Sequence, residues 1–192
     1  MRGYFGIGVE GISKARNVGS LFRSAHAFGA SFMFTLNATY TRAEGNQTDT
    51  SQATGHVPFY DFPDTASLIL PSDCTLVGIE LTDDAIELPS FHHPAQAAYV
   101  LGPEKSSLSP ALQDRCDFIV KIPTKFCVNV GLAGAIVMYD RTISMSRFAD
   151  RAVQAGGPTE PMAAHKHGGI YSRKGMKKFE APPPVAESKI ID

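Results

Sequence analysis

Three short segments of this 192-residue chain carry residues whose types and spacing suit chemistry. The first runs from Asn17 to Gly29 and has the apolar spacing of a helix, with Val18, Leu21, Phe22 and Ala25 on one stripe. Arg23 lies off that stripe, near the start of the helix, where a cation meets the positive end of the helix dipole. This mildly unfavourable placement favours a functional role for Arg23, although an ordinary surface arginine fits the pattern too.

The second segment is a hydrophobic run that ends in a turn, Gly102-Pro103, with Glu104 at its tip. Ligands of open α/β sheets bind outside the carboxyl ends of strands, where such a turn lies. A plain strand-to-helix connection explains the same residues, with Ser109 as the helix N-cap before Pro110.

The third segment runs from Ile122 to Gly134, where a strand ends, an irregular loop follows and a helix begins near Asn129. Gly131 and Gly134 allow close approach of a ligand or of another backbone. Two plainer interpretations stay open: Cys127 as a small buried apolar residue and Asn129 as an N-cap.

The elements around these segments alternate between strands and helices, which predicts a mostly parallel sheet covered by helices on both faces. The expected strands are residues 3–9, 31–36, 75–80, 99–101 and 118–122, and the expected helices are residues 17–28 and 129–143. Gly6-Ile7-Gly8-Val9-Glu10-Gly11 matches the dinucleotide-binding pattern, but the helix pattern starts only at Asn17. No acidic residue follows near Ser31, so we interpret these glycines as part of a strand.

Composition gives coarser limits. The net charge is −1, so any RNA-binding surface must be locally concentrated. Three widely spaced cysteines indicate reduced thiols, and no run approaches the roughly 18 apolar residues that span a bilayer, so we expect a cytoplasmic protein without a metal site. Residues 1–147 form the expected folded domain, and residues 148–192, rich in breakers and poor in large apolar side chains, a flexible or partner-draped tail.

Together, the order and spacing of the three segments resemble the SpoU/TrmH family of S-adenosylmethionine-dependent RNA 2′-O-methyltransferases, within the SPOUT superfamily. The matching motifs are Asn17 to Ala25, Gly102 to Ser109 and Ile122 to Ala133. The resemblance implies an α/β fold with a C-terminal deep trefoil knot, a homodimer, and S-adenosyl-L-methionine as cofactor. It also implies an RNA substrate, namely tRNA.

The resemblance also implies site residues. The catalytic residues would be Arg23, Glu104 and Asn129, and those at the cofactor would be Glu80, Leu81, Gly102, Ile122, Val128 and Val130. We expect RNA contacts at Lys14, Arg16, Asn17, Arg42, Lys125 and Arg141. The chain departs from many relatives at Cys127, where a serine is common, and at Ser107, where a glycine is common. A base methyltransferase and a non-catalytic RNA-binding dimer are the alternatives.

Overall fold

The computed structural model describes residues 3–39, 53–103, 106–146, 148, 151–152 and 155–156. Its strands are β1 (Tyr4–Glu10), β2 (Phe32–Leu36), β3 (Phe59–Phe62), β4 (Thr75–Ile79), β5 (Ile86–Glu87), β6 (Gln96–Leu101) and β7 (Phe118–Lys121). Its helices are α1 (Ala15–Phe28), α3 (Ala53–His56), α4 (Pro110–Arg115) and α5 (Val130–Met145), with a 3₁₀ turn, η1, at Leu88–Ser90.

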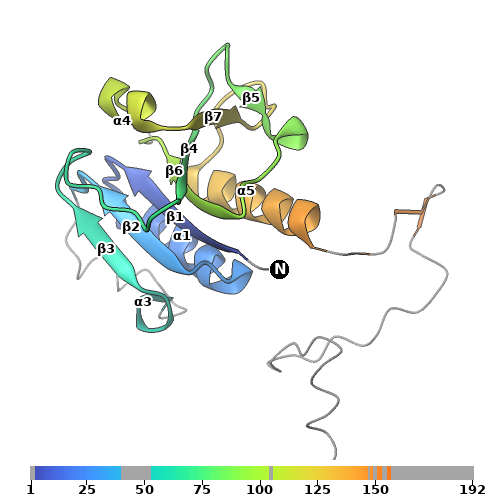
Figure 1. The fold of residues 1–192 in the computed structure, drawn as a ribbon, viewed down its shortest axis with the longest axis horizontal. Helices are drawn as coiled ribbons and strands as arrows, with labels where there is room; N and C mark the ends of the chain where they lie inside the picture. Colours follow the sequence, from blue (N-terminus) through green and yellow to red (C-terminus); the bar gives the residue numbers. More distant parts are fainter. Residues whose placement is uncertain are drawn as a thin grey trace, which may run out of the picture. The chain divides into compact units, whose positions relative to one another are not determined.

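The strands form one sheet in the order β3-β2-β1-β6-β4-β7-β5, and every neighbouring pair is parallel (Figure 1). This confirms the predicted α/β class. The five predicted strands are present, shifted by a few residues at their ends. The edge strands β3 and β5 were missed because they are short and half exposed, so they lack the apolar run that marks the central strands.

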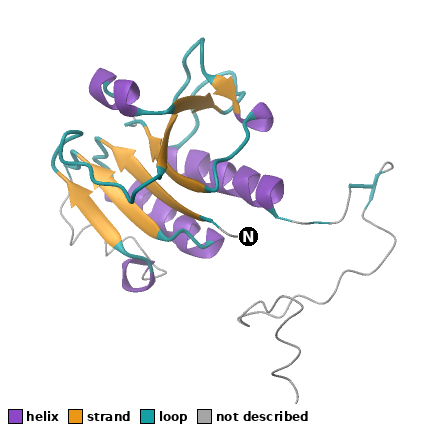
Figure 2. Cartoon of the chain, in the orientation of Figure 1, coloured by secondary structure: helices purple, strands orange, loops and turns teal. Residues whose placement is uncertain are grey.

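Alternation along the central strands separates two cores. Along β6, Ala97, Tyr99 and Leu101 face one core, and Ala98 and Val100 face the other. The apolar stripes of α1 and α5 fill the first core, whereas Leu108, Leu112 of α4 and Leu68 cover the second. Helices therefore cover both faces, and Figure 2 shows α1 and α5 lying side by side along the strands.

The glycines of β1 are explained by this packing. An added Cβ on Gly6 would lie 2.2 Å from the ring of Phe32, and one on Gly8 would lie 2.5 Å from the ring of Phe34. Both glycines thus make room for aromatic rings of β2 on the second face of the sheet. The glycine pattern belongs to a strand, which confirms that it is no dinucleotide-binding turn.

Close contact between α1 and α5 brings the first and third sequence segments together. A Cβ on Gly134 would lie 2.3 Å from Cδ1 of Leu21, so a larger residue would displace the Leu21 side chain between the two helices. Helix α1 ends where expected, with Gly29 in the left-handed conformation at φ 75°. The helix pair therefore fixes where the N-termini of α1 and α5 lie.

Contacts divide the chain into two units, Met1–Phe148 and Ala149–Asp192, and all of these helices and strands lie in the first. Most of the second unit lies outside the described residues, so the predicted character of the tail stays a prediction. Among the described residues, no helix has the length and apolar character needed to cross a membrane.

Candidate active site

A pocket of about 370 Å³ opens at the carboxyl ends of β4, β6 and β7. Each of these strands contributes its last apolar residue or the loop that follows, and α5 closes the pocket with its first turns. The lining residues are Ile79, Glu80, Leu81, Leu101, Gly102, Pro103, Ser106, Ser107, Ile122, Thr124, Cys127, Val128, Val130 and Ala133. The volume falls within the range of small-molecule sites, and the location is where open parallel sheets bind ligands.

All of the residues predicted to contact the cofactor line this one pocket, although they come from four separate segments. Leu81, Val128 and Val130 supply apolar wall, and Gly102 supplies close access to the main chain. A Cβ on Gly102 would lie 2.9 Å from Oε2 of Glu80 and 3.2 Å from the backbone nitrogen of Leu108. Only a glycine therefore leaves this part of the pocket open without displacing a neighbour.

The carboxylate of Glu80 makes two hydrogen bonds to backbone N–H groups beside the pocket. Oε1 accepts a hydrogen bond from the Leu81 N–H at 2.9 Å, and Oε2 accepts one from the Leu108 N–H at 2.7 Å. The Leu81 N–H therefore already donates a hydrogen bond within the chain. The sequence signal was an acid at the end of a buried strand, and Glu10 at the end of β1 repeats it.

Of the predicted catalytic residues, Asn129 is fixed most clearly. Its Oδ1 accepts the Gly131 N–H at 2.9 Å as the N-cap of α5, and its Nδ2 donates to Oδ1 of Asn17 at 3.1 Å. The plainer N-cap interpretation is therefore correct, and the same side chain also joins the third motif to the first. The Asn17–Asn129 pair lies next to Val128 and Val130, which line the pocket.

Arg23 is exposed on α1, two turns beyond Asn17, and does not line the pocket of its own chain. Glu104 and Arg42 lie outside the described residues. Cys127 lines the pocket and is exposed, so it is not the buried apolar residue of the plainer interpretation.

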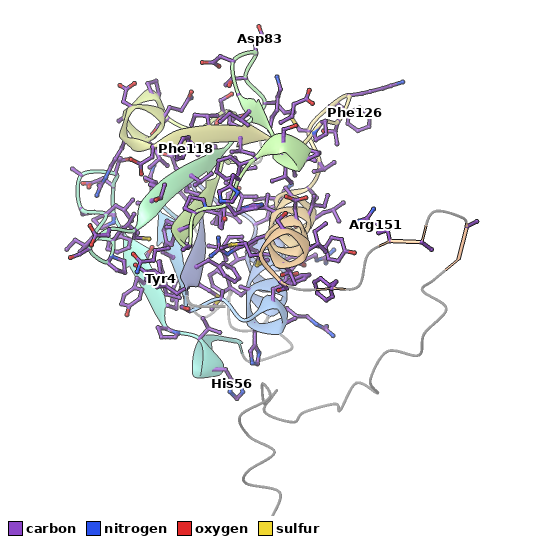
Figure 3. The ribbon with its side chains drawn as sticks, turned by 45° about the vertical axis from the view of Figure 1, so that its right-hand side comes forward. Tyr4, His56, Asp83, Phe118, Phe126 and Arg151 are labelled. Atoms are coloured by element: carbon purple, nitrogen blue, oxygen red, sulfur yellow. The ribbon has the colours of Figure 1, made fainter. Side chains whose placement is uncertain are left out.

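The RNA contacts predicted from charge divide into two groups. Lys14, Arg16 and Lys125 are exposed near the N-termini of α1 and α5, and Asn17 is partly buried among them. Beside Lys125, the ring of Phe126 is 76% exposed and points away from the ribbon on the loop after β7 (Figure 3). In sequence, Lys125 and Phe126 lie between Thr124 and Cys127, which line the pocket, so a basic and an aromatic side chain flank it on this loop.

Arg141 does not belong to that surface, which corrects its prediction as an RNA contact. It is 2% exposed, and its guanidinium donates hydrogen bonds to the carbonyl oxygens of Pro94, Tyr4 and Ala95 and to the hydroxyl of Tyr99. It therefore ties α5 to the amino ends of β1 and β6. Sequence spacing placed it on a helix but did not show that its charge points into the protein.

A sequence model of the SpoU rRNA Methylase family matches residues 5–139, which include all three motifs. The chain belongs to this family.

Relatives of the family share the same region. An uncharacterized tRNA/rRNA methyltransferase of Archaeoglobus fulgidus is 28% identical over 153 residues, which cover 76% of this chain and 66% of that protein. A Staphylococcus aureus protein assigned to the TrmH family tRNA/rRNA methyltransferases is 26% identical over 144 residues, covering 69% of this chain and 56% of that protein. The chain thus matches just under two thirds or less of the length of these relatives.

Solved structures of the family share the fold. The SpoU methyltransferase AviRb from Streptomyces viridochromogenes, in complex with the cofactor AdoMet, superposes with a TM-score of 0.67 at 20% identity. The superposition covers 77% of this chain and 60% of AviRb. At this identity the likeness establishes the architecture of the SpoU fold for this chain.

Proposed function

We propose that this chain is an S-adenosylmethionine-dependent RNA methyltransferase that methylates a ribose 2′-hydroxyl, with tRNA as its substrate. The observation that carries the proposal is the convergence of the predicted cofactor residues on one pocket in a chain of the SpoU rRNA Methylase family. The cofactor found with AviRb and the tRNA/rRNA descriptions of the relatives support the choice of cofactor and substrate class. An RNA substrate also accords with the expected cytoplasmic location.

The residues present fit this cofactor. The apolar side chains of Leu81, Val128 and Val130 would enclose the adenine ring, and the opening at Gly102 would admit its sugar to the main chain. Bound there, S-adenosylmethionine supplies an activated methyl group on a sulfonium whose departure as a neutral thioether needs no acid catalyst.

The work left to the protein is alignment and charge stabilisation. The hydroxyl oxygen would form its new bond to the methyl carbon as the carbon–sulfur bond breaks, and the hydroxyl proton would leave to water or to a phosphate. Holding the three atoms in line supplies several kcal/mol, about the gain expected from orientation alone. A guanidinium near the oxygen favours its developing negative charge, and the high pKa of arginine makes it a poor proton acceptor.

Arg23 is our choice for that guanidinium, acting at the pocket of a partner subunit, because it does not line the pocket of its own chain. Dimerisation is supported by an apolar strip on α5, on which Leu132 and Tyr139 are 54% and 55% exposed, seven residues apart. Family membership supports the trefoil knot, with α5 and the loop before it threaded through the chain. Sedimentation would show whether the protein is a dimer in solution.

The test of the proposal is incubation of the purified protein with labelled S-adenosylmethionine and total bacterial RNA from a strain that lacks it. We expect label in one RNA size class, recovered after nuclease digestion as a 2′-O-methyl nucleoside. Label on a base would instead establish a base methyltransferase. Cofactor and RNA binding without transfer to any RNA class would contradict the assignment, and RNA binding without cofactor binding would identify a non-catalytic RNA-binding protein.

A further inference from the structure

The loop between β6 and α4 forms one wall of the pocket. It contributes Gly102, Pro103, Ser106 and Ser107 to the lining, and the motif acid Glu104 lies within it. Strand β6 runs between β1 and β4 in the sheet, so the loop emerges between the ends of those two strands. Side chains at the carboxyl ends of β1 and β4 can therefore contact the loop from both sides.

An acid stands at each of these two positions, Glu10 as the last residue of β1 and Glu80 directly after β4. Oε2 of Glu80 accepts the N–H of Leu108 at 2.7 Å, and Oε2 of Glu10 accepts the N–H of the next residue, Ser109, also at 2.7 Å. Two strands thus direct carboxylates at two consecutive amides of the loop. Hydrogen bonds with an ionised acceptor are about twice as strong as neutral ones.

The surroundings show that these bonds belong to a built arrangement. Glu10 is only 7% exposed, so its hydrogen bond is sheltered from competing water. The other side of Leu108 is also held, because Nε2 of Gln113 donates to its carbonyl oxygen at 2.7 Å. At the opposite end of the loop, the absence of a side chain on Gly102 leaves room for the Glu80 carboxylate.

We propose that Glu10 and Glu80 act as positioning residues, a carboxylate clamp that holds the β6–α4 loop in the shape that binds the cofactor. The inference rests on the proposed function, since it concerns the same pocket. Without the clamp the loop populates other shapes, and the apparent Kd rises in inverse proportion to the fraction of molecules that remain competent. Neither residue needs to touch the methyl group or the RNA.

The two acids differ in a way that a substitution can test. Glu80 uses both oxygens, one on Leu81 and one on Leu108, whereas the described structure gives Glu10 one hydrogen bond, to Ser109. A glutamine has one acceptor oxygen, so Glu10→Gln can keep its bond while Glu80→Gln must lose one. We expect the Kd for S-adenosylmethionine, measured by calorimetry, to rise about tenfold in Glu80→Ala, about threefold in Glu80→Gln and less than about twofold in Glu10→Gln.

Asp117 provides the matched control. Its Oδ2 also accepts a backbone N–H, from Leu76 at 2.8 Å, but it lies at the amino end of the sheet and does not line the pocket. Asp117→Ala should lower the melting temperature without changing the cofactor Kd. If Glu80→Ala binds the cofactor as tightly as the wild type, or if Asp117→Ala weakens binding as much as Glu80→Ala does, the clamp is wrong and the proposed function stands.

Hydrogen exchange tests the clamp without any cofactor. The amides of Leu108 and Ser109 should exchange slowly in the wild type, and Glu80→Ala should accelerate Leu108 more than Ser109, with the reverse in Glu10→Ala. Exchange of both amides at the unprotected rate in the wild type would overturn the clamp by itself. Slow exchange combined with no cofactor binding by the wild type would instead overturn the proposed function and leave the clamp as a feature of the fold alone.

Discussion

The two ends of the sheet differ in how their polar residues are used. At the amino end, the buried side chains of Arg141, Tyr99 and His93 form a chain of hydrogen bonds that ends at the partly buried Asp140. At the carboxyl end, the pocket is lined by exposed loop residues such as Ser106, Ser107 and Cys127. The first arrangement holds the helix to the sheet, and the second leaves room for a ligand.

Hydrogen bonding at the amino end can be assigned in one direction. The Asp140 carboxylate can only accept, so Nε2 of His93 carries the proton and donates to it at 2.9 Å. Nδ1 of the neutral imidazole then accepts from the Tyr99 hydroxyl at 2.6 Å, and that hydroxyl accepts in turn from Arg141 at 3.0 Å. Burial raises the pKa of Tyr99 to about 12, which keeps it protonated as this chain requires. A polar network is stabilising when every member is satisfied, as here.

The largest effect in this comparison is expected at the carboxyl end. Arg23→Ala should lower turnover about a hundredfold or more, because it removes the positive charge proposed to stabilise the developing oxyanion. Thermal unfolding should be nearly unchanged, since Arg23 is exposed. Methyl transfer to RNA and thermal unfolding measure the two sides of this prediction. Unchanged turnover in a folded variant would remove Arg23 from the mechanism.

Arg141→Ala should show the opposite pattern. Removal of the guanidinium leaves several carbonyl oxygens without their donor and takes one of the two hydrogen bonds of the Tyr99 hydroxyl, so the free energy of unfolding should fall by about 3 kcal/mol in denaturant titrations. The folded fraction should retain RNA affinity, because Arg141 is buried. Loss of RNA binding at full stability would restore the role first predicted for it.

The sequence predicted the helices and strands, which depend on periodicity. It did not predict which way a helix side chain points in the folded protein. The stripe Val18, Leu21, Phe22 and Ala25 fixed α1, and the breaks at Gly29 and Pro123 fixed element ends to within a few residues. Arg23 and Arg141 are both arginines on helices in an amphipathic pattern, and nothing local shows that one points to solvent and the other into the sheet. That difference arises only when α5 packs on β1 and β6.

For the site, the lining residues could be named from the sequence, but the side-chain roles of Glu80 and Glu10 could not. The pocket-lining residues were named from the family resemblance, and the parallel sheet brings together the strand ends that carry them. The side-chain role of Glu80 and the participation of Glu10 depend on β6 lying between β1 and β4. Strand order is set by tertiary packing and is not readable from the spacing of two acids that are 70 residues apart.

Acidic pH should lower the free energy of unfolding through His93, at the amino end of the sheet. Burial lowers the pKa of His93 below its ordinary value of 6.5, an effect that outweighs the hydrogen bond to Asp140. Below about pH 6.5 the unfolded chain therefore binds a proton that the folded chain does not, and stability falls by at most about 1.4 kcal/mol per pH unit from this residue. Stability at each pH is read from urea titrations.

His93→Gln is the control for that slope. Its amide can accept from Tyr99 and donate to Asp140 but cannot titrate, so the variant should lose stability less steeply than the wild type between pH 6.5 and lower values. Comparing the two proteins cancels the other five of the six histidines. Equal slopes would mean that His93 keeps its ordinary pKa in the folded protein.

The smallest effect is expected at Cys127, where it separates ribose from base chemistry. The thiol lines the pocket and is exposed, a position from which it could attack a base covalently. Transfer to a ribose hydroxyl needs no such nucleophile, so Cys127→Ser should change turnover by no more than about threefold, as expected when one weak hydrogen-bonding group replaces another. Single-turnover methylation and a search for a covalent RNA adduct by denaturing electrophoresis measure both possibilities. Because serine keeps the size but not the nucleophilicity of the thiolate, a loss of a hundredfold or more with intact cofactor binding would shift the assignment to base methylation.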